Sequence, residues 1–404
     1  MSSQAESRGV ARYRVLMQRP SVPALFGWAI VARLPIGMTG LALVLLVRSM
    51  GAGYGEAGVV AAAYTAAVAV GAPYAGRQVD RRGVAPALRL RLVAFPGLLA
   101  LLALLGAFDA PVVLLAVAAA AAGLTLPPVS SALRSIWPRV LGEDDARTAY
   151  ALEAALQELI FVGGPLIVAV LAALWPAGGV LGAAVFAAVG TFAFMRLAPV
   201  RDAGPAEHRH GSPLGALSSA GVRTITLLAL FLGLAFACVE IAVPAFAELH
   251  GSRALAGIVL AGFSAGSLVG GLAAGLRPSS NEPRRLLLGA AALAAALALP
   301  LLSTSVATMT VLLFVAGLPI APMIAAAYGI IGRVAALGSV AEAFSWFGTA
   351  VSTGFAGGAI AGGWLIDEQG WRSSVVLGVG FAATGVALVV ARRSTLARAR
   401  EPLP

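Results

Sequence analysis

Residues 76–83 read Gly-Arg-Gln-Val-Asp-Arg-Arg-Gly, a short charged segment between two long apolar runs. Gly76 allows a neighbouring helix to approach closely, and Gly83 permits a tight turn. Asp80 is the single acid of the segment, and a carboxylate is favoured at the partly positive N-terminus of a helix. The segment therefore predicts a tight turn between two closely packed helices, with an acid that can face a helix N-terminus.

The runs that flank this loop belong to a series that extends over the whole chain. Hydrophobic residues make up 59% of the sequence and charged residues 11%, which excludes a water-soluble protein. A helix of about 20 apolar residues crosses the hydrocarbon core of a bilayer, where each backbone polar group must be paired internally. We therefore expect an all-α membrane protein with twelve transmembrane helices, near residues 22–47, 56–76, 90–108, 111–133, 149–174, 177–197, 222–247, 254–276, 284–304, 307–331, 341–366 and 371–391.

Arginine, which supplies every basic residue, is distributed unevenly between the two sides of these spans. One set of alternate loops, together with both termini, holds most of the arginines, whereas the other set holds only Arg48, Arg253 and Arg372. Cytoplasmic loops carry the excess of basic residues, so both termini are predicted to be cytoplasmic, which requires an even number of helices. The exclusive use of arginine and the abundance of alanine and glycine suggest a GC-rich bacterial genome. We expect a multi-pass protein of the bacterial inner (plasma) membrane.

The longest polar segment, residues 198–221, follows the sixth predicted helix and is rich in glycine and proline. It divides the chain into a bundle at 1–197, a cytoplasmic linker at 198–221 and a second bundle at 222–404. His208 and His210 lie in this linker, where no further metal ligands stand nearby. We therefore expect no metal and no cofactor.

The loop at 76–83 resembles the G-x-x-x-D-R-x-G signature of the major facilitator superfamily, which also lies between helices 2 and 3. The resemblance implies two pseudo-symmetric six-helix bundles and transport by alternating access. It also implies a conformational latch in which the acid docks on helix 11, made here by Gly76, Asp80, Arg81, Gly83, Arg134 and Glu342. An arginine-rich loop with one stray acid is the alternative interpretation. The matching segment after helix 8, Gly275-Leu276-Arg277-Pro278, lacks the acid, which speaks against a second latch.

Helix 5 contains Gly163-Gly164-Pro165, which resembles part of the G-x-x-x-G-P-x-x-G-G element of the family's drug:proton antiporters. Val168 and Ala169 stand where that element has its glycine pair. Gly164 and Pro165 predict a helix kink, because proline removes a backbone hydrogen bond. The resemblance implies export, whereas a kink used only for packing explains the same residues.

Ionisable residues inside the apolar spans are the best pointers to a site, since each costs at least ~2.5–3.5 kcal/mol at a helix centre. Arg33, Glu158 and Glu240 lie deep in helices 1, 5 and 7, and Glu153 and Gln157 lie nearer the cytoplasm. The resemblance implies that Arg33 pairs with Glu158 and that Glu240 faces a central cavity. A carboxylate there takes up and releases protons as the cavity opens to either side. A static ion pair between helices is the alternative.

Helices 4 and 10, which are symmetry mates in the family, each carry two prolines, at positions 127, 128, 319 and 322. Interrupted helices at equivalent places of two halves are typical of a transporter's substrate site. An apolar, partly aromatic lining is predicted there from Trp28, Phe236, Met323, Tyr328 and Trp346.

Several function classes are excluded by residue content. Without lysine there is no nucleotide-binding loop of the G-x-x-x-x-G-K-[ST] type, and no Ser/His/Asp or Cys/His set is available, so we do not expect an enzyme. The net charge of +10 does not indicate nucleic-acid binding, because the arginines lie between apolar spans. Cys238 is the single cysteine, so no intramolecular disulfide forms.

Three hypotheses remain, and all three assume a monomer surrounded by membrane lipid. The first is a secondary active transporter that exports small, largely apolar molecules in exchange for protons. The second is uptake or exchange of a polar or anionic metabolite, with Arg33 as the counter-charge. The third is a membrane scaffold or sensor that transports nothing.

Overall fold

The computed structural model describes residues 14–52, 54–206, 214–250, 255–276 and 281–397, and within these residues all regular structure is helical. The main helices are α2 (Val22–Ser49), α3 (Tyr54–Arg82), α4 (Val84–Ala107), α5 (Val112–Thr125), α6 (Val129–Leu174), α7 (Gly178–Arg196), α9 (Ala220–Leu249), α10 (Ala256–Leu276), α11 (Glu282–Ala296), α12 (Val306–Gly317), α13 (Ile320–Val334), α14 (Val340–Gln369) and α15 (Trp371–Ala391). Short helical segments are α8 (Ala198–Arg201), η1 (Gly215–Ser218), η3 (Leu299–Leu302) and α16 (Arg393–Ala397).

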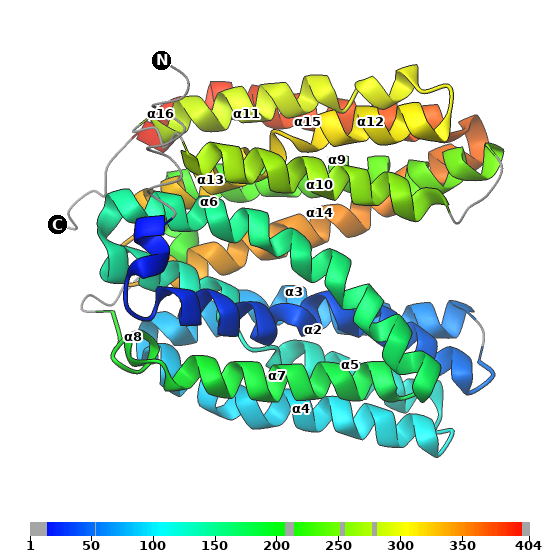
Figure 1. Cartoon of the computed structure of the whole chain (residues 1–404), viewed down its shortest axis with the longest axis horizontal. Helices are drawn as coiled ribbons and strands as arrows, with labels where there is room; N and C mark the ends of the chain where they lie inside the picture. Colours follow the sequence, from blue (N-terminus) through cyan, green and yellow to red (C-terminus); the bar gives the residue numbers. More distant parts are fainter. Residues whose placement is uncertain (1–13, 53, 207–213, 251–254, 277–280, 398–404) are drawn as a thin grey trace.

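Twelve helical segments of the described chain are long and apolar enough to cross a membrane, which confirms the predicted number. The first and last described helices lie at the same end of the bundle, at the left of Figure 1. We call this end the terminus face. An even number of spans places both chain ends on one side, as the arginine distribution predicts.

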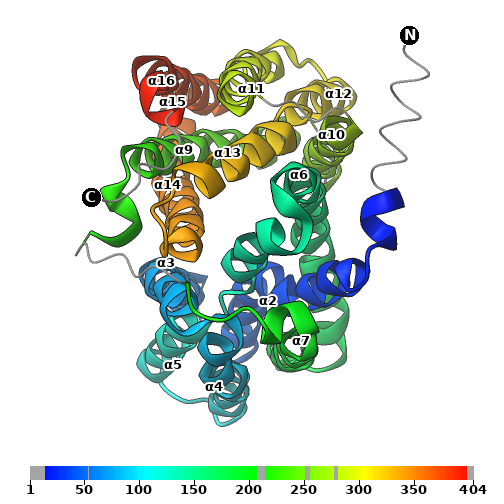
Figure 2. The same cartoon turned by 90° about the vertical axis from the view of Figure 1, so that its left-hand side faces the viewer.

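The helices form two groups, the N-terminal half (α2–α7) and the C-terminal half (α9–α15), seen below and above each other in Figure 1. Within the first half α2 packs against α3, α6 and α7, and within the second half α9 packs against α14 and α15. The halves meet where α3 lies against α14 and where α6 lies against α10 and α13. Figure 2, which looks onto the terminus face, shows the two groups side by side with α3 next to α14.

The fourth and tenth spans are each made of two helices with a break between them. Thr125 ends α5 and Val129 begins α6, across Pro127 and Pro128. Gly317 ends α12 and Ile320 begins α13, across Pro319. Proline has no backbone N–H group to donate, so it favours a break in a helix. Both breaks lie at the prolines where the sequence predicts interruptions.

The fourth span extends beyond the apolar run that predicts it. Helical structure continues through the arginines at 134 and 139 to Gly142, which has φ +77° and joins the fourth span to the fifth inside α6. The apolar run ends before the helix does, because Arg134 is buried against protein partners, whereas Arg139 is exposed at the terminus face.

Gly164 lies where α6 crosses α2, and a Cβ atom on it would come within 2.7 Å of the carbonyl carbon of Gly37. The helix passes through Pro165 with helical dihedral angles, and the non-helical residue within α6 is Gly142. The structure therefore gives Gly164 a role in close helix packing, and a bend of the helix at Gly164 and Pro165 stays a prediction.

Candidate functional site

Asp80, near the end of α3, joins the two halves at the terminus face. Its carboxylate accepts hydrogen bonds from the backbone N–H groups of Ala341 (3.0 Å) and Glu342 (2.8 Å), in the first turn of α14. These N–H groups have no partner within their own helix, and the helix dipole favours an anion beside them. With Asp80 only 7% exposed, water competes little for these bonds.

Gly76 and Arg77 complete this contact, which we call the latch. A Cβ atom on Gly76 would lie 2.6 Å from the carbonyl oxygen of Ala341, so only glycine allows α3 and α14 to come this close. The Arg77 guanidinium donates to both carboxylate oxygens of Glu342, at 2.7 and 3.1 Å. Residues 76–82, which we expected to form a loop, are the last turns of α3, and Gly83, at φ +85°, makes the turn into α4.

Two residues expected in the latch are placed elsewhere. Arg81 is exposed on the surface, and Arg134 lies in the core beside Glu153. Arg77 was not expected in the latch, although its position three residues before Asp80 puts the two side chains on the same face of α3.

Glu282 makes a second contact between the halves, which we did not expect. Its carboxylate lies 2.9 Å from Nε of Arg147, on α6, and 2.6 Å from Nη2 of Arg333, on α13. With 4% exposure, Glu282 is buried at the start of α11. The sequence analysis found no acid in Gly275–Pro278, and residues 277–280 lie outside the described part of the chain. Glu282, five residues after Arg277, supplies the contact in its place.

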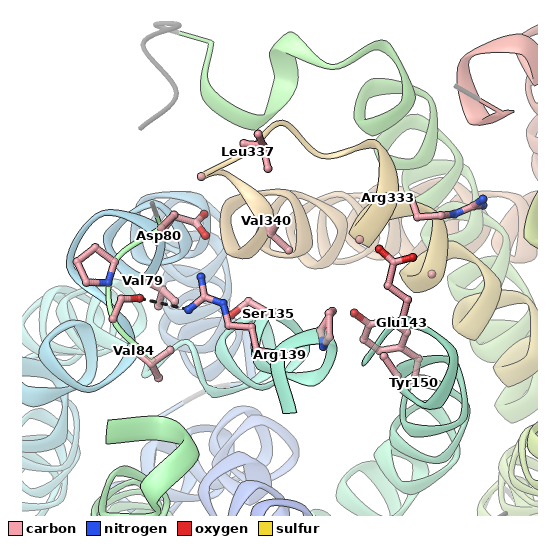
Figure 3. A pocket seen from close by; sticks show the side chains of 18 of the residues that line it. Val79, Asp80, Val84, Ser135, Arg139, Glu143, Tyr150, Arg333, Leu337 and Val340 are labelled. Atoms are coloured by element: carbon pink, nitrogen blue, oxygen red, sulfur yellow. Dashed lines mark hydrogen bonds between the residues drawn. The ribbon is translucent and has the colours of Figure 1, made fainter. Parts of the chain in front are cut away.

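A pocket of about 630 Å³ lies between the latch and this second contact, on the terminus face. Figure 3 shows Asp80, Arg139, Glu143, Tyr150 and Arg333 around it. Its charged lining contains both signs, and Arg139 donates to the carbonyl oxygen of Gly204 at 3.4 Å. The pocket is a polar gap between the halves and does not favour one sign of charge.

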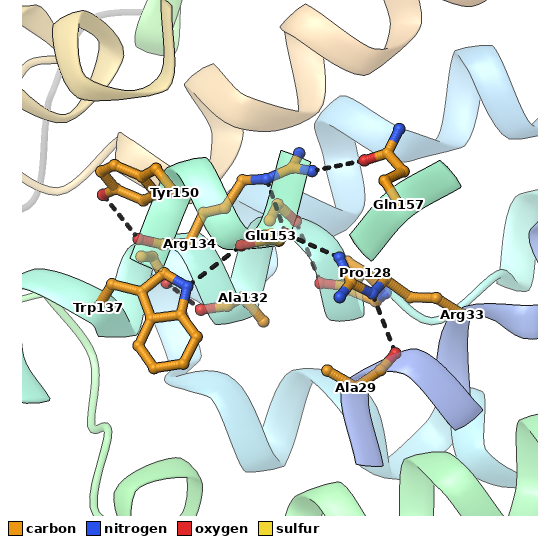
Figure 4. Close-up of polar contacts among 11 residues, drawn as sticks. Ala29, Arg33, Pro128, Ala132, Arg134, Trp137, Tyr150, Glu153 and Gln157 are labelled. Atoms are coloured by element: carbon orange, nitrogen blue, oxygen red, sulfur yellow. Dashed lines mark hydrogen bonds and ion pairs between the residues drawn. The ribbon is translucent and has the colours of Figure 1, made fainter. Parts of the chain in front are cut away.

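A cluster of buried charged groups lies deeper, within the N-terminal half (Figure 4). Oε1 of Glu153 lies 2.7 Å from Nη1 of Arg33 and 3.0 Å from Nε of Arg134. Oε2 of the same carboxylate accepts a hydrogen bond from Nε1 of Trp137 at 3.2 Å. Arg134 also donates to Gln157 at 3.1 Å. Glu153 is fully buried and Arg33 is 2% exposed, so these charges are held by one another and not by solvent.

We expected Arg33 to pair with Glu158, and among the described side chains its carboxylate partner is Glu153. The side chain of Glu158 lies outside the described side chains. Tyr150 donates from its hydroxyl to the carbonyl oxygen of Arg134 at 3.1 Å and so fixes the backbone of the cluster.

A cavity of about 260 Å³, the central cavity, lies between the two halves beside this cluster. Most of its walls are apolar or small residues of α2, α3, α5, α6, α9, α13 and α14. Its polar lining is limited to two guanidinium groups, the Gln157 amide, the Tyr328 phenol and several hydroxyl groups, supplied by Ser130, Ser131, Ser345, Thr349 and Ser352. Polar groups gathered in a largely apolar pocket are typical of a small-molecule site.

An aromatic layer separates the central cavity from the pocket on the terminus face. Tyr150 lines the outer pocket, while Tyr328, Phe344 and Phe347 line the central cavity. The ring centroids of Tyr150 and Tyr328 lie 6.2 Å apart, and those of Tyr328 and Phe344 lie 5.7 Å apart. Because Tyr150 belongs to the N-terminal half and the other rings to the C-terminal half, the layer closes the cavity only when the halves are together.

The remaining predicted site residues are divided between the cavity and its surroundings. Phe236 and Tyr328 line the central cavity, as does Gln157. Met323 is buried in the core of the C-terminal half. Four predicted site residues are not among the described lining residues of the cavity: Trp28, Met323, Trp346 and Glu240. Glu240 is half-buried on α9, one helical turn beyond Phe236.

Trp137 and Glu282 are structurally important residues that the sequence analysis missed. Trp137 stands three residues after Arg134, so the two side chains share a face of α6, and this spacing could have drawn attention to it. Glu282 stands near the start of a predicted helix, where an acid is commonly found because the helix dipole favours a negative charge. Its position in the sequence therefore gave no sign of a contact between the halves.

Comparison with known proteins gives a consistent result for the whole chain. A family model described as Major Facilitator Superfamily matches residues 25–275 and, a second time, residues 225–403. No curated protein matches the sequence.

Several solved structures share the fold at low sequence identity. A bacterial homologue of the iron transporter ferroportin in an outward-facing state superimposes with a TM-score of 0.74 at 11% identity, covering 92% of this chain and 99% of that one. The fucose:proton symporter of E. coli gives 0.73 at 12%, over 92% and 98%. The human organic anion transporter MFSD10 gives 0.69 at 15%, over 92% and 100%. At these identities the likeness concerns the fold alone.

Proposed function

Since the chain belongs to the Major Facilitator Superfamily, and is therefore a multi-pass membrane transporter and not an enzyme, we propose that it moves a small molecule through the central cavity by alternating access. The observation that carries this proposal is the position of that cavity. It lies between the two halves, beside buried charges, and the aromatic layer separates it from the terminus face. A rocking movement of one half against the other would change which side of the membrane reaches it.

The contacts between the halves support a state that is closed at the terminus face. The Asp80 latch and the Glu282 contact both bridge the halves there. Neither contact can persist if the halves separate at this face, so both must break in each transport cycle. The arginine distribution supports assigning the terminus face to the cytoplasm.

The lining supports a small, largely apolar substrate, because most of the cavity wall consists of aliphatic, aromatic and small side chains. We propose export coupled to protons as the direction of transport. Glu153 is the acid best placed for coupling, since two arginines that line the cavity hold it directly behind the wall. Glu240 remains a second candidate for the coupling acid in the C-terminal half.

A second candidate function is uptake or exchange of a polar or anionic metabolite. The observation that favours it is the row of hydroxyl and amide groups in the lining, to which Ser131, Gln157 and Ser345 contribute. The hydroxyl groups of Ser131 and Ser345 donate to backbone carbonyl oxygens of their own helices, and each oxygen can still accept a hydrogen bond from a polar substrate.

Transport by purified protein in proteoliposomes with an imposed pH gradient tests the proposal. The panel contains lipophilic cations, sugars and organic acids, and empty liposomes give the background. We expect at least one class to be carried in a pH-dependent manner, and Glu153→Gln to abolish the dependence on pH. If no member of the panel moves faster than in empty liposomes, the chain behaves as the scaffold or sensor of the third hypothesis.

A further inference from the structure

The charges that face the central cavity are unequal in sign. Arg33 and Arg134 line it, and no carboxylate is found among its described lining residues. Glu153, the single acid of the cluster among the described side chains, is fully buried behind the two guanidinium groups. Two positive charges and one negative charge leave one positive charge unbalanced, and a solute in the cavity meets the arginines first.

One hydrogen-bond donor of this cluster has no partner. Arg33 directs Nε to the carbonyl oxygen of Ala29 at 3.0 Å and Nη1 to Glu153 at 2.7 Å. Its Nη2 atom is buried and makes no hydrogen bond within the described chain. A buried donor left unpaired costs ~1–3 kcal/mol, and more where the group is charged. An acceptor that arrives in the cavity would remove this cost.

The second arginine connects the site to the other half. The guanidinium carbon of Arg134 lies 4.0 Å from the ring centroid of Tyr328, on α13. Arg134 donates Nη2 to Gln157, a neutral amide, so its charge is shared with Glu153 alone among acids of the described residues. A negative group bound between the two arginines would therefore lie against both halves.

We propose that Arg33 and Arg134 bind the anionic group of an amphiphilic organic anion, whose apolar body occupies the rest of the central cavity. This inference rests on the proposed function, because it names the substrate class of the same cavity, and it holds for either direction of transport. Glu153 is a positioning residue here. It orients both guanidinium groups and competes with the substrate for their hydrogen bonds, so it prevents the arginines from holding the anion too tightly to release it.

Naphthalene-2-sulfonate is a suitable probe, because it is ionised at every pH of interest and joins an apolar body to one negative charge. Naphthalene-2-sulfonamide is its neutral counterpart of nearly equal size. We expect isothermal titration calorimetry with the purified, detergent-solubilised protein to show binding of the sulfonate and at least about tenfold weaker binding of the sulfonamide, since an ionic hydrogen bond is about twice as strong as a neutral one.

Two variants should change the affinity for the sulfonate in opposite directions. Arg33→Gln removes one positive charge and should weaken binding about tenfold or more, whereas Glu153→Gln removes the competing negative charge and should strengthen it. Damage to the fold would weaken binding in both. Arg196→Gln, which removes one exposed positive charge at the end of α7, serves as the control and should leave the affinity unchanged.

The outcomes separate this inference from the proposed function. Equal affinity for sulfonate and sulfonamide, or weaker sulfonate binding in Glu153→Gln, overturns the anion site. If the proteoliposomes carry a lipophilic cation or a neutral compound while the sulfonate does not bind, transport stands and the anion site is overturned. If the sulfonate binds with the expected response to both variants, the anion site stands, even where no transport of any compound is found.

Discussion

The carboxylate of Asp80 accepts two hydrogen bonds from the first turn of α14. Asparagine at this position would keep one acceptor oxygen, lose the negative charge and turn an N–H₂ group toward a backbone N–H. Hydrogen bonds to a charged group contribute ~1.5–3 kcal/mol, so Asp80→Asn should accelerate hydrogen exchange of the Ala341 and Glu342 amides by about tenfold or more.

Hydrogen–deuterium exchange followed by mass spectrometry of peptides from the start of α14 measures this effect. Asp202→Asn is the matched control, because it makes the same change at an exposed acid near the same face. Unchanged protection of the two amides in Asp80→Asn would contradict the docking of Asp80 on α14.

Glu153 is the shared partner of two buried arginines. Glu153→Ala leaves both guanidinium groups without a carboxylate, and breaking a buried ion pair in this way costs ~3–5 kcal/mol. We expect a large fall in the thermal midpoint of the detergent-solubilised protein, whereas Glu368→Ala, at an exposed acid of α14, should leave the midpoint nearly unchanged. Similar midpoints for the two variants would mean that Glu153 does not hold the cluster together.

For single residues, the sequence did not predict which acid of α6 pairs with Arg33. The family resemblance implies that the first and fifth spans are neighbours, and α2 does pack against α6. The choice between Glu153 and Glu158 depends on the rotation of α6, because five residues turn a helix by about 140° relative to a given face. That rotation is set by packing contacts such as Gly164 against Gly37, which no local pattern reveals.

At the level of helices, α3 and α14 form the tightest contact between the halves at the terminus face. Gly76→Ala would bring a Cβ atom within 2.6 Å of the Ala341 carbonyl oxygen, so the two helices must move apart. We expect the distance between spin labels at Arg82→Cys and Arg393→Cys to lengthen in Gly76→Ala, measured by double electron–electron resonance. Gly97→Ala, where nothing lies within 4 Å of the added atom, should leave the distance unchanged.

An unchanged distance in Gly76→Ala would show that α3 and α14 tolerate a side chain at their crossing.

The signature at 76–83 predicted this crossing correctly, because its glycines and its acid each have one physical use at a helix contact. It did not predict Arg77 or the length of α6, since both depend on the partners that buried arginines find in the folded chain.

For the whole molecule, the number of spans and the common side of the two chain ends follow from hydropathy and arginine placement alone. The fold is therefore largely predictable from the sequence. The cavity is not, because its lining residues come from seven helices of both halves, and only the folded chain brings them together. The Glu282 contact was missed for a related reason: Arg147 and Arg333 belong to different halves, and only the closed arrangement brings all three together.

The central claim is that the two faces open alternately. With Cys238→Ser to remove the native thiol, one pair of spin labels at Arg82→Cys and Arg393→Cys reports on the terminus face, and another at Leu114→Cys and Leu249→Cys reports on the opposite face. Asp80→Asn combined with Glu282→Gln weakens both contacts between the halves. We predict that the combined variant lengthens the first distance and shortens the second, measured by double electron–electron resonance in lipid nanodiscs. Lengthening of both distances, or no change in either, would contradict alternating access.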